Sequence, residues 1–409
     1  MSEQISMFAP GPAPTGDDDD EGLSPIVVAS RDGELETARR LLAANANPNC
    51  SANENGFTPL MAASEEGHVG VVELLLEAHA DPGAGMTEDG CVALMLAAGE
   101  GRVGAVAALL GCPRTDPNAA RSDDGSTALM LAAQEGFVAV AARLLDGGAD
   151  AEATSKAQAT ALALAAQQGH TDVVALLLER GAAPDRPKSN DGATPLSLAA
   201  AAGQTAAAAA LLAAGATVDS ARTDDGSTPL TLAAQSGHLA TVRCLLASGA
   251  DPNKRMLDGS SALMLAAQEE EEEEEEAADG PPGRDYVGTV GALLASGADP
   301  DLARDDDGST ALTLAAQELN IRIAASLLVA GADPNKARTD DGTTALMFAA
   351  VEGGLSFSLS LSRSLSLSRS PPGGKEEGFV SVTPRRFLSY RHTGCSWLCI
   401  LAVMHGDGL

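Results

Sequence analysis

The chain has 409 residues and a formal charge of −31, from 57 acidic and 26 basic residues. This balance argues against a nucleic-acid binder, because neutralising phosphates requires a net basic face. Hydrophobic residues make up 44% of the chain but aromatic residues only 2%, so we expect a core built from Ala, Leu and Val.

The first segment, residues 1–23, combines four consecutive aspartates, Asp17 to Asp20, with three prolines and few apolar side chains. A segment that buries so little apolar surface does not repay its chain entropy. We therefore expect residues 1–23 to be disordered. They also lack a basic start followed by an apolar run, so no secretory signal is expected.

From residue 24 to residue 354 the sequence repeats itself. The repeat is anchored on a leucine that follows Thr-Pro or Thr-Ala in most units, here called the anchor leucine: Leu60, Leu94, Leu129, Leu162, Leu196, Leu230, Leu263, Leu312 and Leu346. Successive anchors are 34, 35, 33, 34, 34, 33, 49 and 34 residues apart. A weaker unit with Ser24-Pro25-Ile26 precedes the first anchor. The pattern predicts one degenerate leading unit, eight fuller units and a broken last unit.

The unit that begins at Asp225-Gly226 shows what each repeat is expected to form. Asp-Gly is typical of a tight hairpin tip. Thr228 is a plausible helix cap, and Pro229 is well placed in a first helical turn. Apolar residues at 230–234 predict a first helix that Gly237 ends, and apolar residues at 242, 245 and 246 predict a second that Gly249 ends.

Stacking must hold these helices together, because isolated helices shorter than about 12–15 residues are marginal in water. Pairs of alanines recur at one place in the first helix, where a larger side chain would wedge neighbouring units apart: Ala132-Ala133, Ala165-Ala166, Ala199-Ala200, Ala233-Ala234, Ala266-Ala267 and Ala315-Ala316. The sequence therefore predicts an array in which each unit contacts its neighbours.

The period, together with the Thr-Pro-Leu, Ala-Ala, Gly-His, Leu-Leu and Gly-Ala-Asp-Pro-Asn elements, resembles the ankyrin repeat over about four-fifths of the chain. The resemblance implies an all-α fold, an ankyrin-repeat solenoid of stacked helix-turn-helix units with β-hairpin fingers. It also implies a scaffold whose partners bind the concave surface formed by the fingers and the first helices. One departure is that the family's histidine after Thr-Pro-Leu is replaced in every unit, by Met61 and Thr231 for example, which removes a hydrogen-bonding side chain between repeats.

Two sets of polar residues recur in register and are candidate partner contacts. A basic ladder stands eight residues before the anchor leucine: Arg121, Lys188, Arg222, Arg255, Arg304 and Arg338. A glutamine ladder stands five residues after it: Gln134, Gln167, Gln235, Gln268 and Gln317. Two interpretations stay open for the basic ladder, contact with a partner or pairing with aspartates in the fingers. The glutamines are likewise either partner contacts or ordinary surface residues.

Two further sets are better explained by structure than by binding. Aspartates precede glycine at the expected hairpin tips, where Asp-Gly is preferred for backbone reasons: Asp89, Asp124, Asp191, Asp225, Asp258, Asp307 and Asp341. Three histidines follow glycine in the turn between the helices: His68, His170 and His238. They are spread over different repeats, which favours a shared structural role over catalysis.

Nothing in the sequence indicates an enzyme. The phosphate-loop, H-E-x-x-H and G-x-S-x-G motifs are absent, and we expect no cofactor and no metal. The six cysteines are scattered, without a C-x-x-C pair, which is typical of free thiols in a reducing compartment. We therefore expect a cytoplasmic protein, with the nucleus as the alternative. The longest apolar stretch near the end is far below the roughly 20 residues that span a bilayer, so membrane association is not expected.

One repeat is interrupted and the last is broken. An insertion at about residues 269–283 contains the run Glu269 to Glu276, which we expect to extend the preceding helix as a solvated spur; the alternative is a docking site for a basic peptide. Residues 355–409 are a low-complexity Ser/Leu/Arg tail whose alternation would suit a strand but is more typical of disorder. We expect a disordered tail, or a product of gene-model error or truncation.

These observations lead to one principal hypothesis and two rivals. The principal hypothesis is a monomeric, non-enzymatic protein–protein interaction scaffold, with partners that include basic segments. The first rival is a targeting or substrate-recruitment module of a larger enzyme whose catalytic domain is missing from this chain. The second is membrane association through the basic, partly apolar segment Arg385 to Met404.

Overall fold

The computed structural model describes residues 24–52, 54–188, 191–268 and 284–352. The expectations for residues 1–23, for the insertion at 269–283 and for the tail at 355–409 fall outside the described residues. The chain divides into two compact units between Thr217 and Val218, and each is described by itself.

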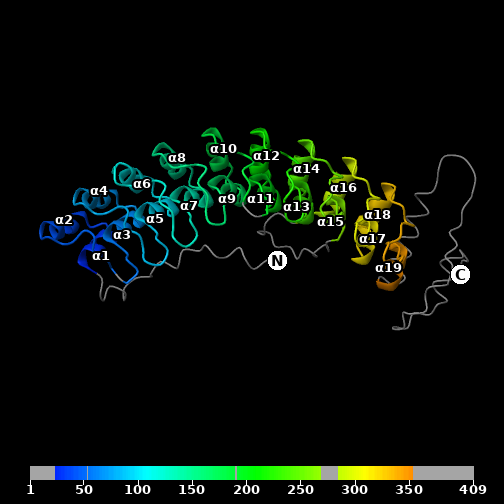
Figure 1. Ribbon diagram of the computed structural model, residues 1–409, viewed down its shortest axis with the longest axis horizontal. Helices are drawn as coiled ribbons and strands as arrows, with labels where there is room; N and C mark the ends of the chain where they lie inside the picture. The colour runs from blue at the N-terminus through cyan, green and yellow to red at the C-terminus, as the bar shows by residue number, and fades with distance from the viewer. Residues whose placement is uncertain (1–23, 53, 189–190, 269–283, 353–409) are drawn as a thin grey trace, which may run out of the picture. The chain divides into compact units, whose positions relative to one another are not determined.

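Up to Thr217 the described chain consists of helix pairs. The first helices are α1 (Pro25–Arg31), α3 (Pro59–Glu66), α5 (Ala93–Gly99), α7 (Ala128–Glu135), α9 (Ala161–Gln168) and α11 (Pro195–Ala201). The second helices are α2 (Leu35–Ala43), α4 (Val69–Glu77), α6 (Val103–Leu110), α8 (Val138–Asp146), α10 (Thr171–Glu179) and α12 (Thr205–Ala213). Each first helix packs against the next first helix and each second helix against the next second helix, so the unit has two helical layers (Figure 1).

From Val218 the same arrangement recurs. The first helices are α13 (Pro229–Gln235), α15 (Ala262–Gln268), α17 (Ala311–Gln317) and α19 (Ala345–Glu352), and the second helices are α14 (Leu239–Ala247), α16 (Tyr286–Ala295) and α18 (Ile321–Val329). The all-α prediction is confirmed. Within the described residues the β-structure is confined to isolated antiparallel bridges, such as Ala120↔Thr127 and Ala303↔Thr310, at the bases of hairpins. We call each hairpin, with its two flanking residues, a finger.

Local chemistry sets the helix ends as the sequence predicts. Thr228 caps α13 by accepting a hydrogen bond from the Thr231 backbone N–H at 3.3 Å, and Pro229 takes the first helical position. Gly237 then follows the helix with a φ of 69°, in the left-handed region where a Cβ is unfavourable. Two short helices separated by a tight turn result.

The core lies between and within the two layers and is built from small side chains. Ala165 and Ala166 in α9 are completely buried, and so are Ala199 and Ala200 in α11. The second helices contribute completely buried leucines, such as Leu177 in α10. Alanine therefore allows consecutive first helices to approach closely, while leucine fills the space beneath them.

In several repeats the position where the family usually has histidine is used for capping. Thr231 is buried, and its hydroxyl accepts a hydrogen bond from the Thr228 N–H at 2.7 Å. In α3 the Sδ atom of Met61 accepts from the Thr58 N–H at 3.4 Å. In α3 and α13 the residue that replaces histidine thus caps the start of its own helix, and ties between repeats come from other residues.

Candidate functional site

Seven of the finger turns are built around an aspartate. In the finger that precedes α7, the Arg121 N–H donates to the Ser126 carbonyl at 2.9 Å and closes the hairpin. The carboxylate of Asp124 accepts from the Ser126 N–H at 2.8 Å, which fixes the turn on which Gly125 has a φ of 75°.

All the aspartates predicted to have a turn function show this hydrogen bond. Each accepts from the backbone N–H two residues later, at 2.8 to 3.0 Å: Asp89, Asp124, Asp191, Asp225, Asp258, Asp307 and Asp341. The prediction that these aspartates have a structural function in the turns is therefore confirmed.

These hydrogen bonds also affect ionisation. Partial burial of Asp225 and Asp307 opposes the charged form, but hydrogen bonds from Ser227 and Ser309 and the nearby Arg222 and Arg338 outweigh it. The pKa of each carboxyl is therefore lowered. These aspartates hold their turns as carboxylates.

Consecutive fingers within a unit are joined through the backbone. The Ser122 N–H donates to the Asp89 carbonyl at 2.6 Å, and Lys156 donates to Asp124 in the same way at 2.7 Å. In the second unit, Leu257 donates to Asp225 at 2.9 Å and Thr339 to Asp307 at 2.8 Å. Equivalent side chains of neighbouring fingers are therefore held side by side.

Two arginines of the basic ladder tie one finger to the preceding one. Arg121 lies 2.7 Å from Asp89 of the preceding finger and 3.0 Å from Asp123 of its own. Arg338 lies 3.2 Å from Asp307 of the preceding finger and 2.7 Å from its own Asp340. Both guanidinium groups are mostly buried by these contacts, so the pairing interpretation of the ladder has direct structural support.

The other members of the ladder differ in their surroundings. Arg222 pairs with Asp224 of its own finger at 2.7 Å, and the side chain of Lys188 is half-buried. Arg304 donates to Ser260 Oγ at 2.9 Å and to Gln268 Oε1 at 2.7 Å. This last contact brings the basic ladder and the glutamine ladder together.

Arg255 does not occupy the same place as its counterparts. In its finger, Met256 makes the backbone hydrogen bond, to Ser260 at 2.8 Å, that Arg121 makes to Ser126. This finger is one residue shorter, so Arg255 lies one position further from the turn, in the bridge to Ser261 where the other finger has Ala120. It reaches forward to Asp305 of the next finger at 2.6 Å instead of back to the preceding one.

The glutamine ladder lies at the ends of the first helices, beside the fingers. Gln235, Gln268 and Gln317 are exposed, whereas Gln134 and Gln167 are half-buried. Gln317 donates to Glu318 at 3.2 Å, within its own repeat. The side-chain amides of these three glutamines, in α13, α15 and α17, are thus accessible on the finger side of the second unit.

The turn histidines have the structural function that the sequence indicates. The Nε2 atom of His68 donates to the Arg31 carbonyl at 2.8 Å, and Nε2 of His170 donates to the Gln134 carbonyl at 2.8 Å. Both carbonyls lie in the preceding repeat. Arg102 makes the same contact with Nε, to the Glu65 carbonyl at 2.8 Å. The structural prediction is confirmed for His68 and His170.

One set of inter-repeat ties was not predicted. The side chain of Asn118 accepts from the Asp150 N–H at 2.7 Å, and Asn253 accepts from the Asp299 N–H at 2.7 Å. The side chain of Asp301 likewise accepts a hydrogen bond from the Asp333 N–H at 2.8 Å. The recurring Asp-Pro-Asn element could have indicated these ties. It places a short polar side chain at the same position of the turn that follows a second helix.

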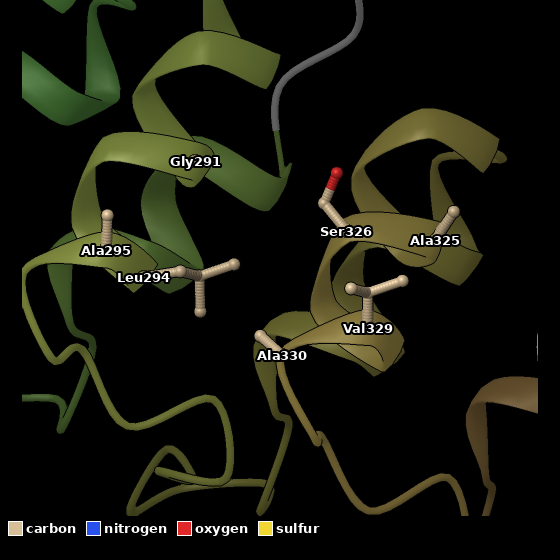
Figure 2. A pocket seen from close by; sticks show the side chains of 7 residues that line it. All are labelled: Gly291, Leu294, Ala295, Ala325, Ser326, Val329 and Ala330. Atoms are coloured by element: carbon tan, nitrogen blue, oxygen red, sulfur yellow. The ribbon is translucent and has the colours of Figure 1, made fainter. Parts of the chain in front are cut away.

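A groove lies between the second helices α16 and α18, away from the fingers of the second unit (Figure 2). Its volume is about 510 Å³, and it is lined by Gly291, Leu294, Ala295, Ala325, Ser326, Val329 and Ala330. The lining is apolar apart from one hydroxyl and includes no titratable side chain. The groove therefore offers none of the converging polar groups that usually orient a small ligand.

Two observations bear on other kinds of site. Among the residues that the structure describes, no group of three or more His, Cys, Asp or Glu side chains is arranged to hold a metal ion. None of the described helices is both long and apolar enough to cross a bilayer.

Comparison with known families agrees with this architecture. The family model for three tandem ankyrin repeats matches residues 4–86, 79–155, 129–222, 183–256, 218–277 and 283–361. No individually curated protein matches the chain. Since the matches cover most of its length, and since helix pairs, turn glycines and fingers recur at the matching period, the chain belongs to the ankyrin repeat family.

Proposed function

We propose that this chain is a non-enzymatic protein-interaction scaffold that binds its partner along the fingers and the first helices. Ankyrin repeats are generally protein–protein interaction modules and are typically non-catalytic. The proposed contact residues are the basic ladder, with Arg255 in its shifted position, and the glutamine ladder. This surface is a better candidate than the groove between α16 and α18, because polar and charged groups recur on it at regular spacing.

The observation that carries this proposal is the division of charge within the fingers. Arg121, Arg222 and Arg338 are each paired with an aspartate of their own finger and are mostly buried, whereas the side chains of those aspartates, Asp123, Asp224 and Asp340, stay 42%, 43% and 43% exposed. The fingers therefore present carboxylates to solvent beside the exposed glutamines. With a net charge of −31, the chain favours approach by a basic segment of a partner.

The free thiols support an intracellular site of action. Among the described residues, Cys50, Cys91, Cys112 and Cys244 are all free. Disulfides are rare in reducing compartments, so this state suits the cytoplasm, with the nucleus as the alternative. We propose that the array acts there as a monomer.

Affinity purification with matched variants tests the proposed surface. One variant carries Gln134→Ala, Gln167→Ala, Gln235→Ala and Gln317→Ala on the first helices. The control carries Glu73→Ala, Glu77→Ala, Asp172→Ala and Glu179→Ala on exposed positions of second helices. Partners captured by the unchanged chain should be lost from the first variant and kept by the control, although the control changes the charge more. Loss of the partners from the control and their retention by the first variant would place binding on the second helices.

A charge variant tests the preference for a basic partner. Changing Asp123, Asp224 and Asp340 to Asn keeps the side-chain shape and removes three exposed charges. We expect weaker capture, and a shallower loss of capture between low and physiological salt, because screening acts on the removed charges. Unchanged capture and unchanged salt dependence would contradict a basic partner segment.

A further inference from the structure

One segment recurs at the tips of four fingers with a single variable position. The segment is Arg-X-Asp-Asp-Gly, and the four copies agree at every position except X. The residues at X are all exposed: Ser122, Thr223, Asp305 and Thr339. A phosphorylated hydroxyl and a carboxylate both carry negative charge and acceptor oxygens. The four tips therefore differ at the one position where phosphorylation would make them alike.

The finger fold does not require a hydroxyl at this position. The backbone N–H of Ser122 donates to a carbonyl of the preceding finger, and the backbone N–H groups of Lys156 and Leu257 make the same bond from their own fingers. The turn itself is held by Asp124, whose carboxylate accepts from the Ser126 N–H at 2.8 Å. Neither task uses the Ser122 hydroxyl.

A second serine in the same finger has the opposite surroundings. Ser126 is only 8% exposed, and its hydroxyl donates to Asp124 at 2.7 Å. In the finger of Asp305, Ser309 is likewise buried and donates to Asp307 at 2.6 Å. The finger of Ser122 therefore presents one serine to solvent and holds the other within its turn.

The residues that follow the exposed hydroxyls indicate which enzyme would modify them. Two aspartates come directly after each hydroxyl: Asp123-Asp124, Asp224-Asp225 and Asp340-Asp341. Kinases select substrates in part by complementary charge. A kinase with a basic groove for the residues after the hydroxyl therefore matches this sequence.

We propose that Ser122, Thr223 and Thr339 are phosphorylation sites for a protein kinase that recognises acidic residues after the hydroxyl. The hydroxyl oxygen forms a bond to the γ-phosphorus of Mg-ATP, and the bond from that phosphorus to the β–γ bridging oxygen breaks. ADP leaves with the electron pair of the broken bond, and the hydroxyl proton passes to the catalytic aspartate of the kinase. Each phosphate adds a charge of about −1.5 to −2 to its finger.

At Ser122 the neighbouring finger supplies a cation for the phosphate. The Nζ atom of Lys156 donates to the Ser122 carbonyl at 2.7 Å, so the ammonium group lies beside this residue. The carboxylate at the equivalent position already has such a partner, because Asp305 accepts from Arg255 of its neighbouring finger at 2.6 Å. A phosphate on Ser122 therefore pairs with Lys156 and links the two fingers.

The added charge lies beside the exposed finger carboxylates, such as Asp123, that are proposed to meet a basic partner segment. Stronger capture of such a partner by the phosphorylated chain is expected, and this consequence rests on the proposed function. The modification itself does not rest on it, because phosphate incorporation is measured without a partner. Failure of one therefore leaves the other open to its own test.

Phosphorylation of the full chain tests the proposal, with a purified kinase that prefers acidic residues after the hydroxyl, Mg-ATP and site mapping by mass spectrometry. Phosphate should appear at Ser122, Thr223 and Thr339, and Ser126 should stay unmodified. Asp123→Asn keeps the side-chain shape and removes the nearest acid. In this variant phosphorylation of Ser122 should fall by about tenfold or more, whereas Thr223 and Thr339 of the same chain serve as unchanged controls.

Hydrogen exchange tests the pairing of the phosphate with Lys156. Phosphorylation of Ser122 should slow exchange at residues 155–159 by about threefold or more. In Lys156→Gln this slowing should be absent, although Ser122 is phosphorylated to the same extent. Equal slowing with and without the lysine would overturn the assigned ion pair.

Three results would overturn the phosphorylation sites. The first is no phosphate at the three positions when the same kinase modifies a linear peptide of residues 117–127. The second is equal phosphorylation of Ser122 and Ser126, which would assign the modification to the unfolded chain. The third is unchanged phosphorylation of Ser122 in Asp123→Asn, which would contradict recognition of the acidic residues.

Discussion

The finger turns depend on aspartate hydrogen bonds that are repeated from repeat to repeat, such as the bond from the Ser227 N–H to Asp225 at 2.8 Å. The arginines add ion pairs around these turns, but exposed pairs contribute only about 0–1 kcal/mol each. Aspartate therefore determines the finger shape, and arginine joins fingers already formed. A binding function for Arg121 or Arg338 has to coexist with this structural one.

The lowered pKa values predict a loss of stability in acid. Groups whose pKa is lower in the folded chain stabilise it above the unfolded value of about 3.9, and this contribution is lost as pH falls through the folded pKa. The pKa of Asp341 is lowered as well, because hydrogen bonds from Thr343 and the nearby Arg338 outweigh its desolvation. We expect the variant with Asp225→Asn, Asp307→Asn and Asp341→Asn to lose less stability between pH 5 and pH 2, because asparagine keeps the acceptor without titrating. Urea unfolding at a series of pH values measures this, and equal slopes for both proteins would refute it.

Helix capping supports a second prediction at this scale. Thr228→Ala removes the acceptor for the Thr231 N–H and should lower the free energy of unfolding by about 1 kcal/mol. Thr127 occupies the same place in α7 but makes no side-chain capping bond, so Thr127→Ala should cost less. Chemical denaturation of both variants provides the comparison. A larger loss for Thr127→Ala would contradict the capping assignment.

Among the helices, alanine pairs set how closely consecutive first helices approach. Ala166 of α9 is completely buried, and α9 packs against both α7 and α11. A larger side chain there has no space unless the helices separate. The poverty in aromatic residues follows from the same packing, since close layers leave little volume for rings.

Ala166→Leu should therefore destabilise the protein by about 1–3 kcal/mol through overpacking. The matched control is Ala206→Leu at an exposed position of α12, where Leu and Ala have similar helix propensity. Thermal unfolding should show a clearly lower melting temperature for Ala166→Leu and an almost unchanged one for Ala206→Leu. Similar drops for both would indicate that the first helices are not closely packed at Ala166.

The positions of the helices and turns could be predicted from the sequence because the same weak pattern recurs in every repeat. The cap at Thr228, the turn at Gly237 and the inward-facing Leu245 each have counterparts in other repeats. The register of Arg255 could not be predicted, because a spacing of 33 between anchors does not show where the missing residue lies. The partner of Arg304 was equally inaccessible, since Gln268 lies 36 residues away in the sequence.

At the scale of the whole molecule, each unit is held together by contacts between neighbouring repeats. Backbone bonds between fingers, turn side chains such as His170 and the polar residues such as Asn118 all join one repeat to the next. An array of this kind presents equivalent residues in rows. The rows of glutamines and exposed finger carboxylates are the basis for assigning the binding surface to the finger side.

Hydrogen exchange of the chain alone and with a captured partner tests that assignment most directly. The account predicts that the partner slows exchange in the fingers and first helices, as at residues 121–135 and 222–235, and leaves the outer helices α8 and α10 unchanged. Slower exchange confined to α8, α10 and the groove between α16 and α18 would contradict it.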